Sequence, residues 1–300
     1  WRLARVIDVA GWDNYPVYHD RPDNEATVAF ISMTHDLNRT LGGGRPFLLM
    51  ESSPSVSYWF PANRLQRPGQ HRMKSLQAVA HGADSVLYFQ MRKGLGGSEK
   101  FHGAVIDHVG HEHTRVFDDV AQVGADLEKL RAVVGTRIHA DVAIIYDWES
   151  AWALRAASGP SDIAKDCLGW ARDHYLPFWR RGVGVDTPNA DAPLDGYKIV
   201  VAPSLYMVRP GFAERVEAFV AAGGIFVATF LTGIVDDKDL CHTGGWPGPL
   251  RRLLGVWAEE IDYIYPDEAN AVRCLDGNAA GVPAGDYAVR HVCDRIHAET

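Results

Sequence analysis

Short apolar runs alternate with longer amphipathic segments over the first 130 residues, and this order restricts the fold more than any other feature of the sequence. The apolar runs have the length of buried strands and lie at 5–10, 47–50 and 85–91. The segments that follow them have helical spacing and lie at 23–42, 67–82 and 114–130. Strand therefore alternates with helix, as in parallel α/β proteins. A (β/α)8 barrel needs about 250 residues, so a barrel would be represented here only by its last units.

A second α/β region is predicted from about residue 137 onward. Buried-strand runs lie at 140–146, 198–202 and 225–229, and helices are predicted around Trp170 and over 210–222. This order resembles a flavodoxin-like doubly wound domain. The chain contains neither a Gly-x-Gly-x-x-Gly fingerprint nor a Gly-x-Ser-x-Gly elbow, so the sequence indicates neither a dinucleotide site nor a serine nucleophile elbow.

Charge and cysteine content limit the kinds of partner and compartment. The net charge of −8 argues against a nucleic-acid surface or an anionic membrane as partner, and every apolar run is too short to span a bilayer. The four cysteines lie far apart and form no Cys-x-x-Cys pair, which favours free thiols in a reducing compartment. The chain begins at Trp1 without a signal peptide. We therefore expect a cytoplasmic protein, and we expect both ends of this sequence to be cuts inside a longer chain.

The apolar run at 47–50 ends abruptly on the carboxylate of Glu51. If the run is a buried strand, Glu51 lies at the carboxyl end of the sheet. In β/α barrels this end carries the catalytic residues. The pattern alone also fits a structural role, in which Glu51 caps a neighbouring helix or pairs with an arginine.

Polar and aromatic side chains are predicted to gather around Glu51. They come from the other strand ends and the loops that follow them: Asp13, Asn14, Tyr15, Trp59, Gln90, Arg92, Glu99 and His102. Carboxylates, amides and histidine bind sugar hydroxyls, and an aromatic ring covers the apolar C–H face of a sugar. A phosphate site would instead use a glycine-rich helix N-terminus or a basic cluster. The set therefore favours a carbohydrate ligand.

The predicted set contains only one carboxylate suited to covalent chemistry. Retaining glycosidases need two carboxyl groups about 5 Å apart, one as nucleophile and one as acid/base. Glu51 suits the nucleophile because a strand end fixes it, whereas Glu99 lies on a glycine-rich loop and suits substrate hydroxyls. We expect Asp13 to be structural. Taken singly, Trp59 fits loop packing as well as sugar stacking, and His102 fits a structural role.

Three segments of the chain resemble the C-terminal part of a glycoside hydrolase family 42 β-galactosidase. They read GWDNYP, PFLLMESSPS…YW, and RPGQHRMKSLQAVAHGADSVLYFQMRKGLGGSEKFHGAV. The resemblance covers essentially the whole chain. It implies that residues 1–134 are the last β/α units of a TIM (β/α)8 barrel. It also implies that residues 135–300 are a flavodoxin-like (glutamine-amidotransferase-like) trimerisation domain that is truncated at its C-terminus.

The resemblance gives each candidate residue a role. It implies retaining hydrolysis of terminal β-D-galactosides, with Glu51 as the nucleophile and Tyr15 beside it. Trp59 would cover the galactose, and Glu99 and His102 would bind its hydroxyls. The family's acid/base glutamate and its zinc-binding cysteines lie upstream of the positions present here. We therefore expect no metal and no other cofactor in this chain, and the resemblance implies a homotrimer.

Some features depart from the family or leave alternatives open. Gln90-Met91-Arg92 stands where Gln-Trp-Arg is usual, so the preferred galactoside stays open. Three histidines precede a helix in a loop at 108, 111 and 113, and a metal site there is the less favoured interpretation. One alternative to an enzyme is a non-catalytic oligomerisation or carbohydrate-binding fragment that is inactive on its own. Another is a flavodoxin-like sensor domain joined to a lyase-type barrel.

Overall fold

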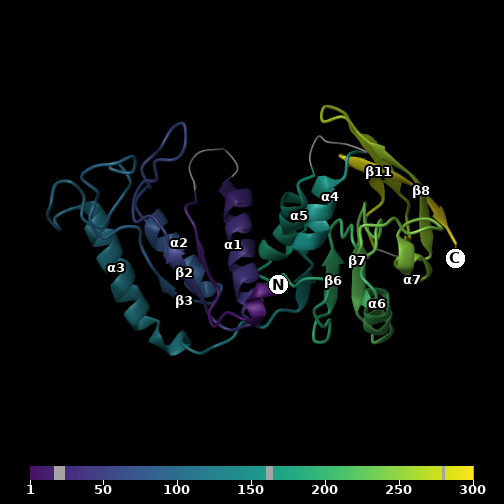
Figure 1. Cartoon of the computed structure of the whole chain (residues 1–300), viewed down its shortest axis with the longest axis horizontal. Helices are drawn as coiled ribbons and strands as arrows, with labels where there is room; N and C mark the ends of the chain where they lie inside the picture. The colour runs from purple at the N-terminus through teal and green to yellow at the C-terminus, as the bar shows by residue number, and fades with distance from the viewer. Residues whose placement is uncertain (17–23, 160–164, 279–280, 300) are drawn as a thin grey trace. The chain divides into compact units, whose positions relative to one another are not determined.

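The chain consists of two compact units (Figure 1). The computed structural model describes residues 1–16, 24–159, 165–278 and 281–299. The first unit comprises Trp1–Ala143 and Arg172–Pro188, and the second comprises Ile144–Ala171 and Asn189–Thr300. Each unit combines segments that are separate in the sequence, so the domain boundary predicted after residue 134 stays a prediction. Within the described residues, no helix combines the length and apolar character needed to cross a bilayer.

Parallel strands form the sheet of the first unit, with β2 between β1 and β3. Their bounds are β1 (Gly11–Asp13), β2 (Phe47–Glu51) and β3 (Ala83–Val86). Asp13 is paired with Glu51 in the register of β1 and β2. Because parallel strands end at the same edge of a sheet, the residues after β1 lie beside the end of β2.

Strand β2 has one buried face. Phe47 and Leu49 are buried in the core of this unit, where they cluster with Ala10, Ala78 and Ala83. The other face is more open, and Met50 is 43% exposed. Successive side chains of a strand point to opposite faces, so the prediction that every residue of the run is buried was correct only for alternate positions.

The first strand does not lie where the sequence pattern predicted it. Leu3–Arg5 forms a 3-10 helix, and Val6 and Val9 are 79% and 51% exposed. Pairing with β2 begins only at Ala10, whose carbonyl accepts the Leu48 N–H at 2.9 Å. The predicted strand at 5–10 was therefore wrong, because Val6 and Val9 are exposed and only Ala10 of this run reaches the core.

The third strand is shorter than predicted and starts earlier. Strand β3 ends at Val86, whereas the apolar run continues to residue 91. Beyond β3 the backbone makes isolated hydrogen bonds, from Leu87 N–H to Leu49 O at 2.9 Å and from Phe89 N–H to Ser52 O at 3.1 Å. Through these bonds the segment after β3 continues alongside the end of β2 before it enters the glycine-rich loop.

The helices of this part confirm the predicted alternation of strand and helix. They are α1 (Asn24–Leu41), α2 (Gln70–Ala80) and α3 (Arg115–Lys129), the last followed by a short 3-10 turn, η2 (Arg131–Val133). After α1, Gly43 and Gly44 adopt positive φ values of 66° and 77°, as glycines that end helices do. Thr114 caps α3, because its side chain accepts the Phe117 N–H at 3.2 Å.

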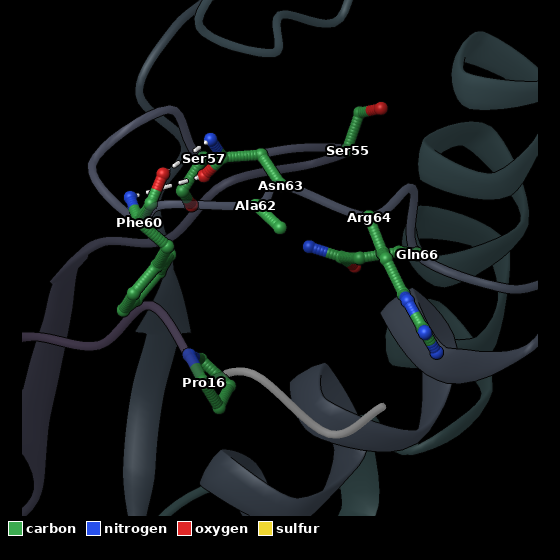
Figure 2. A pocket seen from close by; sticks show the side chains of 8 residues that line it. All are labelled: Pro16, Ser55, Ser57, Phe60, Ala62, Asn63, Arg64 and Gln66. Atoms are coloured by element: carbon green, nitrogen blue, oxygen red, sulfur yellow. Dashed lines mark hydrogen bonds between the residues drawn. The ribbon is translucent and has the colours of Figure 1, made fainter. Parts of the chain in front are cut away.

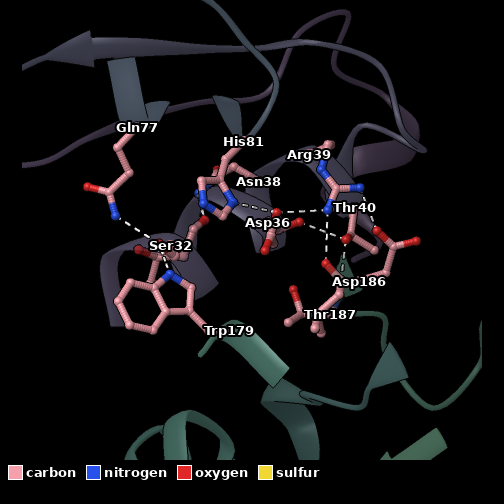
Figure 3. A network of polar contacts seen from close by, with 12 residues as sticks. Ser32, Asp36, Asn38, Arg39, Thr40, Gln77, His81, Trp179, Asp186 and Thr187 are labelled. Atoms are coloured by element: carbon pink, nitrogen blue, oxygen red, sulfur yellow. Dashed lines mark hydrogen bonds and ion pairs between the residues drawn. The ribbon is translucent and has the colours of Figure 1, made fainter. Parts of the chain in front are cut away.

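A buried polar network holds α1 against a late segment of the chain within the first unit (Figure 3). The late segment contains the end of α5 (Cys167–Trp179) and β5 (Val185–Asp186). Asp36 accepts hydrogen bonds from Arg39 at 2.8 Å, His81 at 2.9 Å and Tyr175 at 2.6 Å. Arg39 also donates to Asp186 at 2.5 Å. Burial would raise the pKa of Asp36, but His81 and Arg39 lower it overall.

The second unit contains the parallel strands that the sequence predicted in this region. They are β6 (Ile199–Ala202) and β7 (Ile225–Ala228), with α6 (Phe212–Ala221) between them in sequence. Strands β6 and β7 pair in parallel over their full length. Just after β4 (Val142–Ile144), Ile145 N–H donates to Val201 O of β6 at 2.8 Å. Val142 and Ala143 of β4, which belong to the first unit, pair in parallel with Val185 and Asp186 of β5.

Other elements of the second unit were not predicted. They are α4 (Trp148–Ala156), η3 (Gly248–Leu250), α7 (Arg251–Leu254), β8 (Val256–Tyr263), β9 (Asn270–Cys274), β10 (Gly285–Val289) and β11 (Val292–Ala298). Strand β8 pairs with β11, and β9 with β10, both antiparallel. The structure confirms an α/β protein with parallel sheets and adds these antiparallel pairs.

Candidate active site

Glu51 ends strand β2 and accepts a hydrogen bond from Tyr15. The distance between Tyr15 Oη and Glu51 Oε2 is 2.7 Å. The pairing of β1 with β2 brings Tyr15 there, because the preceding residue, Asn14, donates its N–H to the Glu51 carbonyl at 2.9 Å. Burial and the hydrogen bond to Glu51 raise the pKa of the Tyr15 phenol. The phenol therefore stays protonated and acts as a donor to the carboxylate.

Three aromatic rings meet beside this carboxylate. The Tyr15 ring lies 4.4 Å from the Trp59 ring and 5.6 Å from the His102 ring, both in edge-to-face geometry. Trp59 and His102 lie 5.0 Å apart. Trp59 is half exposed, whereas His102 is fully buried. Such a group offers one accessible aromatic face and one buried ring next to the end of β2.

His102 keeps one ring nitrogen unused. Its Nδ1 lies 3.1 Å from the Gly103 carbonyl, which can only accept, so Nδ1 carries the proton and Nε2 is an acceptor in the neutral ring. Within the described part of the chain, Nε2 is buried and has no hydrogen-bond partner. Buried polar atoms are normally satisfied, so this nitrogen is a candidate to accept a ligand hydroxyl.

Two further carboxylates influence this site. Glu99 is exposed, and its backbone carbonyl accepts a hydrogen bond from the backbone N–H of His102 at 2.9 Å. The pKa of Tyr15 rises mainly through burial and Glu51, with smaller contributions from the charges of Asp13 and Glu99. Burial and the charge of Glu51 raise the pKa of Asp13. The charges of Asp13 and Glu99 therefore add to that of Glu51 around the Tyr15 phenol.

The remaining members of the predicted set act through their backbone. Val105 N–H donates to Gln90 O at 2.9 Å, and Arg92 forms a parallel bridge with Ile106. These contacts join the two ends of the glycine-rich loop. The sequence did not single out Phe89, whose ring meets the His102 ring edge-to-face at 5.1 Å. Phe89 lies near the end of the apolar run at 85–91, and this position could have indicated that its ring reaches the site.

The loop after Glu51 encloses a pocket next to these rings (Figure 2). It is lined by both polar and apolar side chains, those of Pro16, Ser55, Ser57, Phe60, Ala62, Asn63, Arg64 and Gln66. Asn63 fixes the loop by bonding both backbone groups of Phe60, at 3.1 Å and 2.8 Å. In Figure 2 the Gln66 side chain points into the pocket. Pro16, which directly follows Tyr15, borders the pocket on the side of the site.

The described residues include no group of three or more His, Cys, Asp or Glu side chains arranged to hold a metal ion. The rings of His111 and His113 lie 5.5 Å apart, and both residues are exposed. The side chains that meet at the end of β2 are the Glu51 carboxylate, the Tyr15 phenol, the His102 imidazole and the Trp59 indole.

Family models match nearly the whole chain. A β-galactosidase model matches residues 1–130 and a β-galactosidase trimerisation-domain model matches residues 140–300. The chain is 50% identical to β-galactosidase Pbg of Clostridium perfringens and 53% identical to β-galactosidase BglY of Alicyclobacillus acidocaldarius. Both matches cover all of this chain and 43% of the relative. The chain thus spans less than half the length of these relatives.

Solved structures show the same likeness. The crystal structure of the β-galactosidase from Rahnella sp. R3 has a TM-score of 0.97 and 52% identity over all of this chain and 44% of its own. That of the β-galactosidase from Bacillus circulans sp. alkalophilus has a TM-score of 0.93 and 47% identity over all of this chain and 43% of its own. The chain belongs to glycoside hydrolase family 42, the β-galactosidase family whose models match residues 1–130 and 140–300.

Proposed function

We propose that the intact protein is a retaining β-galactosidase and that Glu51 is its nucleophile. The observation that carries the proposal is the position of Tyr15, which bonds the Glu51 carboxylate at 2.7 Å and contacts the rings of Trp59 and His102. A fixed carboxylate next to an accessible indole and an unsatisfied imidazole nitrogen suits a sugar ring. The names of the relatives support a galactoside as that sugar.

In the proposed reaction a carboxylate oxygen of Glu51 attacks the anomeric carbon of the galactoside. The glycosidic bond breaks as an acid protonates the leaving oxygen, and a galactosyl ester of Glu51 forms. Water then attacks the same carbon and gives its proton to the conjugate base of that acid, while the bond to Glu51 breaks and galactose leaves with retained configuration. Tyr15 holds Oε2 of Glu51, so we assign the attack to Oε1. The phenol keeps the carboxylate in one orientation during both steps.

Substrate binding is assigned to the residues around this carboxylate. The half-exposed ring of Trp59 covers the apolar face of galactose. His102 Nε2, which has no partner among the described residues, accepts a bond from one sugar hydroxyl, and the exposed carboxylate of Glu99 accepts from others. A hydroxyl that satisfies a buried nitrogen gains more than one that merely replaces water. His102 is therefore expected to discriminate between sugars that differ at that hydroxyl.

The architecture of the intact protein is also part of the proposal. Strands β1 to β3 alternate with α1 to α3, which supports their assignment to the last units of a TIM barrel. The acid/base carboxyl group is proposed to lie outside these 300 residues, since the relatives are more than twice as long. Residues 140–300 match a trimerisation-domain model, which supports a flavodoxin-like domain and a homotrimer. The cytoplasmic location stays a prediction.

The test is the Glu51→Gln substitution in the intact protein, assayed with a nitrophenyl β-D-galactoside. Glutamine keeps the shape of the side chain but cannot form the ester, so we expect kcat to fall at least a thousandfold. Glu128→Gln is the matched control, because Glu128 is an exposed residue of α3 whose carboxylate pairs with the exposed Arg131. Near-normal turnover by Glu51→Gln would show that Glu51 is not the nucleophile.

A further inference from the structure

Helix α2 buries a lysine behind the turn that follows Glu51. Lys74 is 3% exposed, and its Nζ donates to the Ser53 carbonyl. Burial lowers the pKa of the amine to about 7. None of the ion pairs among the described residues involves Lys74, so no carboxylate there compensates the charge of its amine. Burying an amine in this way is unfavourable, and a neutral side chain of the same shape would fit the position at lower cost.

Ser53 is the centre of a compact turn. Its carbonyl accepts hydrogen bonds both from Lys74 and from the Gln66 side chain, the latter at 3.2 Å. Its hydroxyl accepts the Ser55 N–H at 3.2 Å and donates to Val56 O at 3.2 Å. All these residues of the turn are buried. The amine of Lys74, which comes from helix α2, thus adds a hydrogen bond from outside the turn to those within it.

The same turn connects the nucleophile to the histidine of the site. It begins at Ser52, directly after Glu51, and ends at Val56, whose carbonyl accepts the Gly103 N–H at 2.7 Å. The contact is so close that a Cβ on Gly103 would lie 2.6 Å from Val56 N. His102 immediately precedes Gly103. A shift of the turn would therefore move both the strand end that carries Glu51 and the backbone that carries His102.

We propose that Lys74 is a positioning residue: its amine holds the Ser53 carbonyl and so fixes the turn between Glu51 and His102. This inference rests on the proposed function of Glu51. A hydrogen bond from the protonated amine is charge-assisted and therefore stronger and more directional than a neutral one, and a displacement of about 1 Å at a reacting group costs about a hundredfold in rate. The buried amine then lowers the stability of the protein but improves the geometry of the site.

Lys74→Met in the intact protein tests the proposal, since Met preserves length and apolar volume but cannot donate. We expect kcat/KM for nitrophenyl galactoside to fall at least fivefold, while the thermal unfolding midpoint stays equal or rises. Lys74→Gln retains a neutral donor and is expected to lie between Met and the unaltered protein in activity. Lys129→Met is the control, because Lys129 is an exposed lysine of α3.

Two results overturn the proposal. Activity of Lys74→Met within twofold of the unaltered protein shows that the bond to Ser53 does not position the site. A lowered unfolding midpoint that accompanies the loss of activity shows that Lys74 is a structural residue instead. Glu51→Gln is assayed alongside, so that an error in the nucleophile assignment, seen as full activity of that variant, is distinguished from an error about Lys74.

Discussion

Tyr15 donates its phenolic hydrogen to Oε2 of Glu51 at 2.7 Å, and this bond joins the ends of two neighbouring parallel strands. The same phenol ring packs edge-to-face against Trp59 and His102. Tyr15 therefore contacts both the proposed nucleophile and the proposed sugar-binding rings. Its place is set by the short strand β1, whose register with β2 pairs Asp13 with Glu51.

Tyr15→Phe is expected to lower kcat without unfolding the protein. The substitution keeps the ring contacts but removes a hydrogen bond to a charged group, which is worth about 1.5–3 kcal/mol and so about ten- to a hundredfold in rate. The measurement is steady-state hydrolysis of nitrophenyl galactoside by the intact protein, with circular dichroism as the check on folding. An unchanged kcat would mean that Tyr15 does not orient Glu51.

Gly103→Ala is expected to reduce activity through the turn next to His102. An added Cβ would lie 2.6 Å from Val56 N and 2.8 Å from Val56 O, closer than packed atoms tolerate, so the backbone must move. We expect kcat/KM to fall at least tenfold. Gly124→Ala is the matched control, because a Cβ at Gly124 meets no atom within 4 Å, and alanine favours the helix by about 0.5–1 kcal/mol. Equal activity of both variants would argue against a close fit at Gly103.

Asp36→Asn is expected to destabilise the first unit. Asp36 and Arg39 are both about 4% exposed, and breaking a buried ion pair costs about 3–5 kcal/mol. The check is urea unfolding of the intact protein. The exposed pair of Glu128 and Arg131 provides the control, since Glu128→Gln is expected to change stability by no more than about 0.5 kcal/mol. Equal midpoints for the two variants would contradict a stabilising role for the network.

Lys74→Met is expected to stabilise the protein more at low pH than at high pH. The pKa of the Lys74 amine falls from 10.5 to about 7 on folding. As pH falls from 10.5 towards 7, the unfolded chain gains a proton that the folded chain does not, so folded stability is lost over this window and stays constant below it. Each pKa unit corresponds to about 1.4 kcal/mol, so removing the amine gains on the order of a few kcal/mol at pH 6 and little above pH 10.

Thermal unfolding midpoints of Lys74→Met and the unaltered protein, measured at pH 6 and at pH 9.5, check this prediction. Burial, together with the charges of Lys74 and Arg115, lowers the pKa of the neighbouring His71 to about 3. His71 therefore does not titrate in this range. A difference between the two proteins that does not change with pH would show that the amine is not titrating as proposed.

The sequence predicted the candidate site better than it predicted the elements that support it. Glu51 could be recognised because an apolar run ends on a carboxylate, and the structure brings Tyr15, Trp59 and His102 to its side. Strand ends and loops near one edge of a parallel sheet converge in most arrangements of that sheet. The convergence therefore did not depend on the exact limits of the strands.

The buried polar face of α2 could not be predicted from hydrophobic periodicity. That pattern assumes that buried positions are apolar, but the buried residues of α2 are His71, Lys74, Ser75 and Ala78. Their spacing of three, one and three residues places them on one helix face. A lysine on such a helix face indicates a buried polar contact, because a buried lysine needs a partner.

Strands with little apolar character also escaped prediction. In β9 and β10 four of the five residues of each strand are exposed, so no alternation of apolar and polar residues marks them. The opposite error occurred at 5–10, where apolar residues such as Val6 and Val9 are exposed in the structure. In both cases the partner surface, which the local sequence does not encode, decides whether a segment becomes a strand.

The central claim, that Glu51 forms a covalent bond with the sugar, is tested most directly by trapping that bond. Incubating the intact protein with dinitrophenyl 2-deoxy-2-fluoro-β-D-galactoside slows breakdown of the ester, and mass spectrometry of a peptic digest then locates the label. The account predicts a single fluorogalactosyl group on the peptide that contains Phe47–Glu51, and no label in Glu51→Gln. A label on a different carboxylate would contradict it.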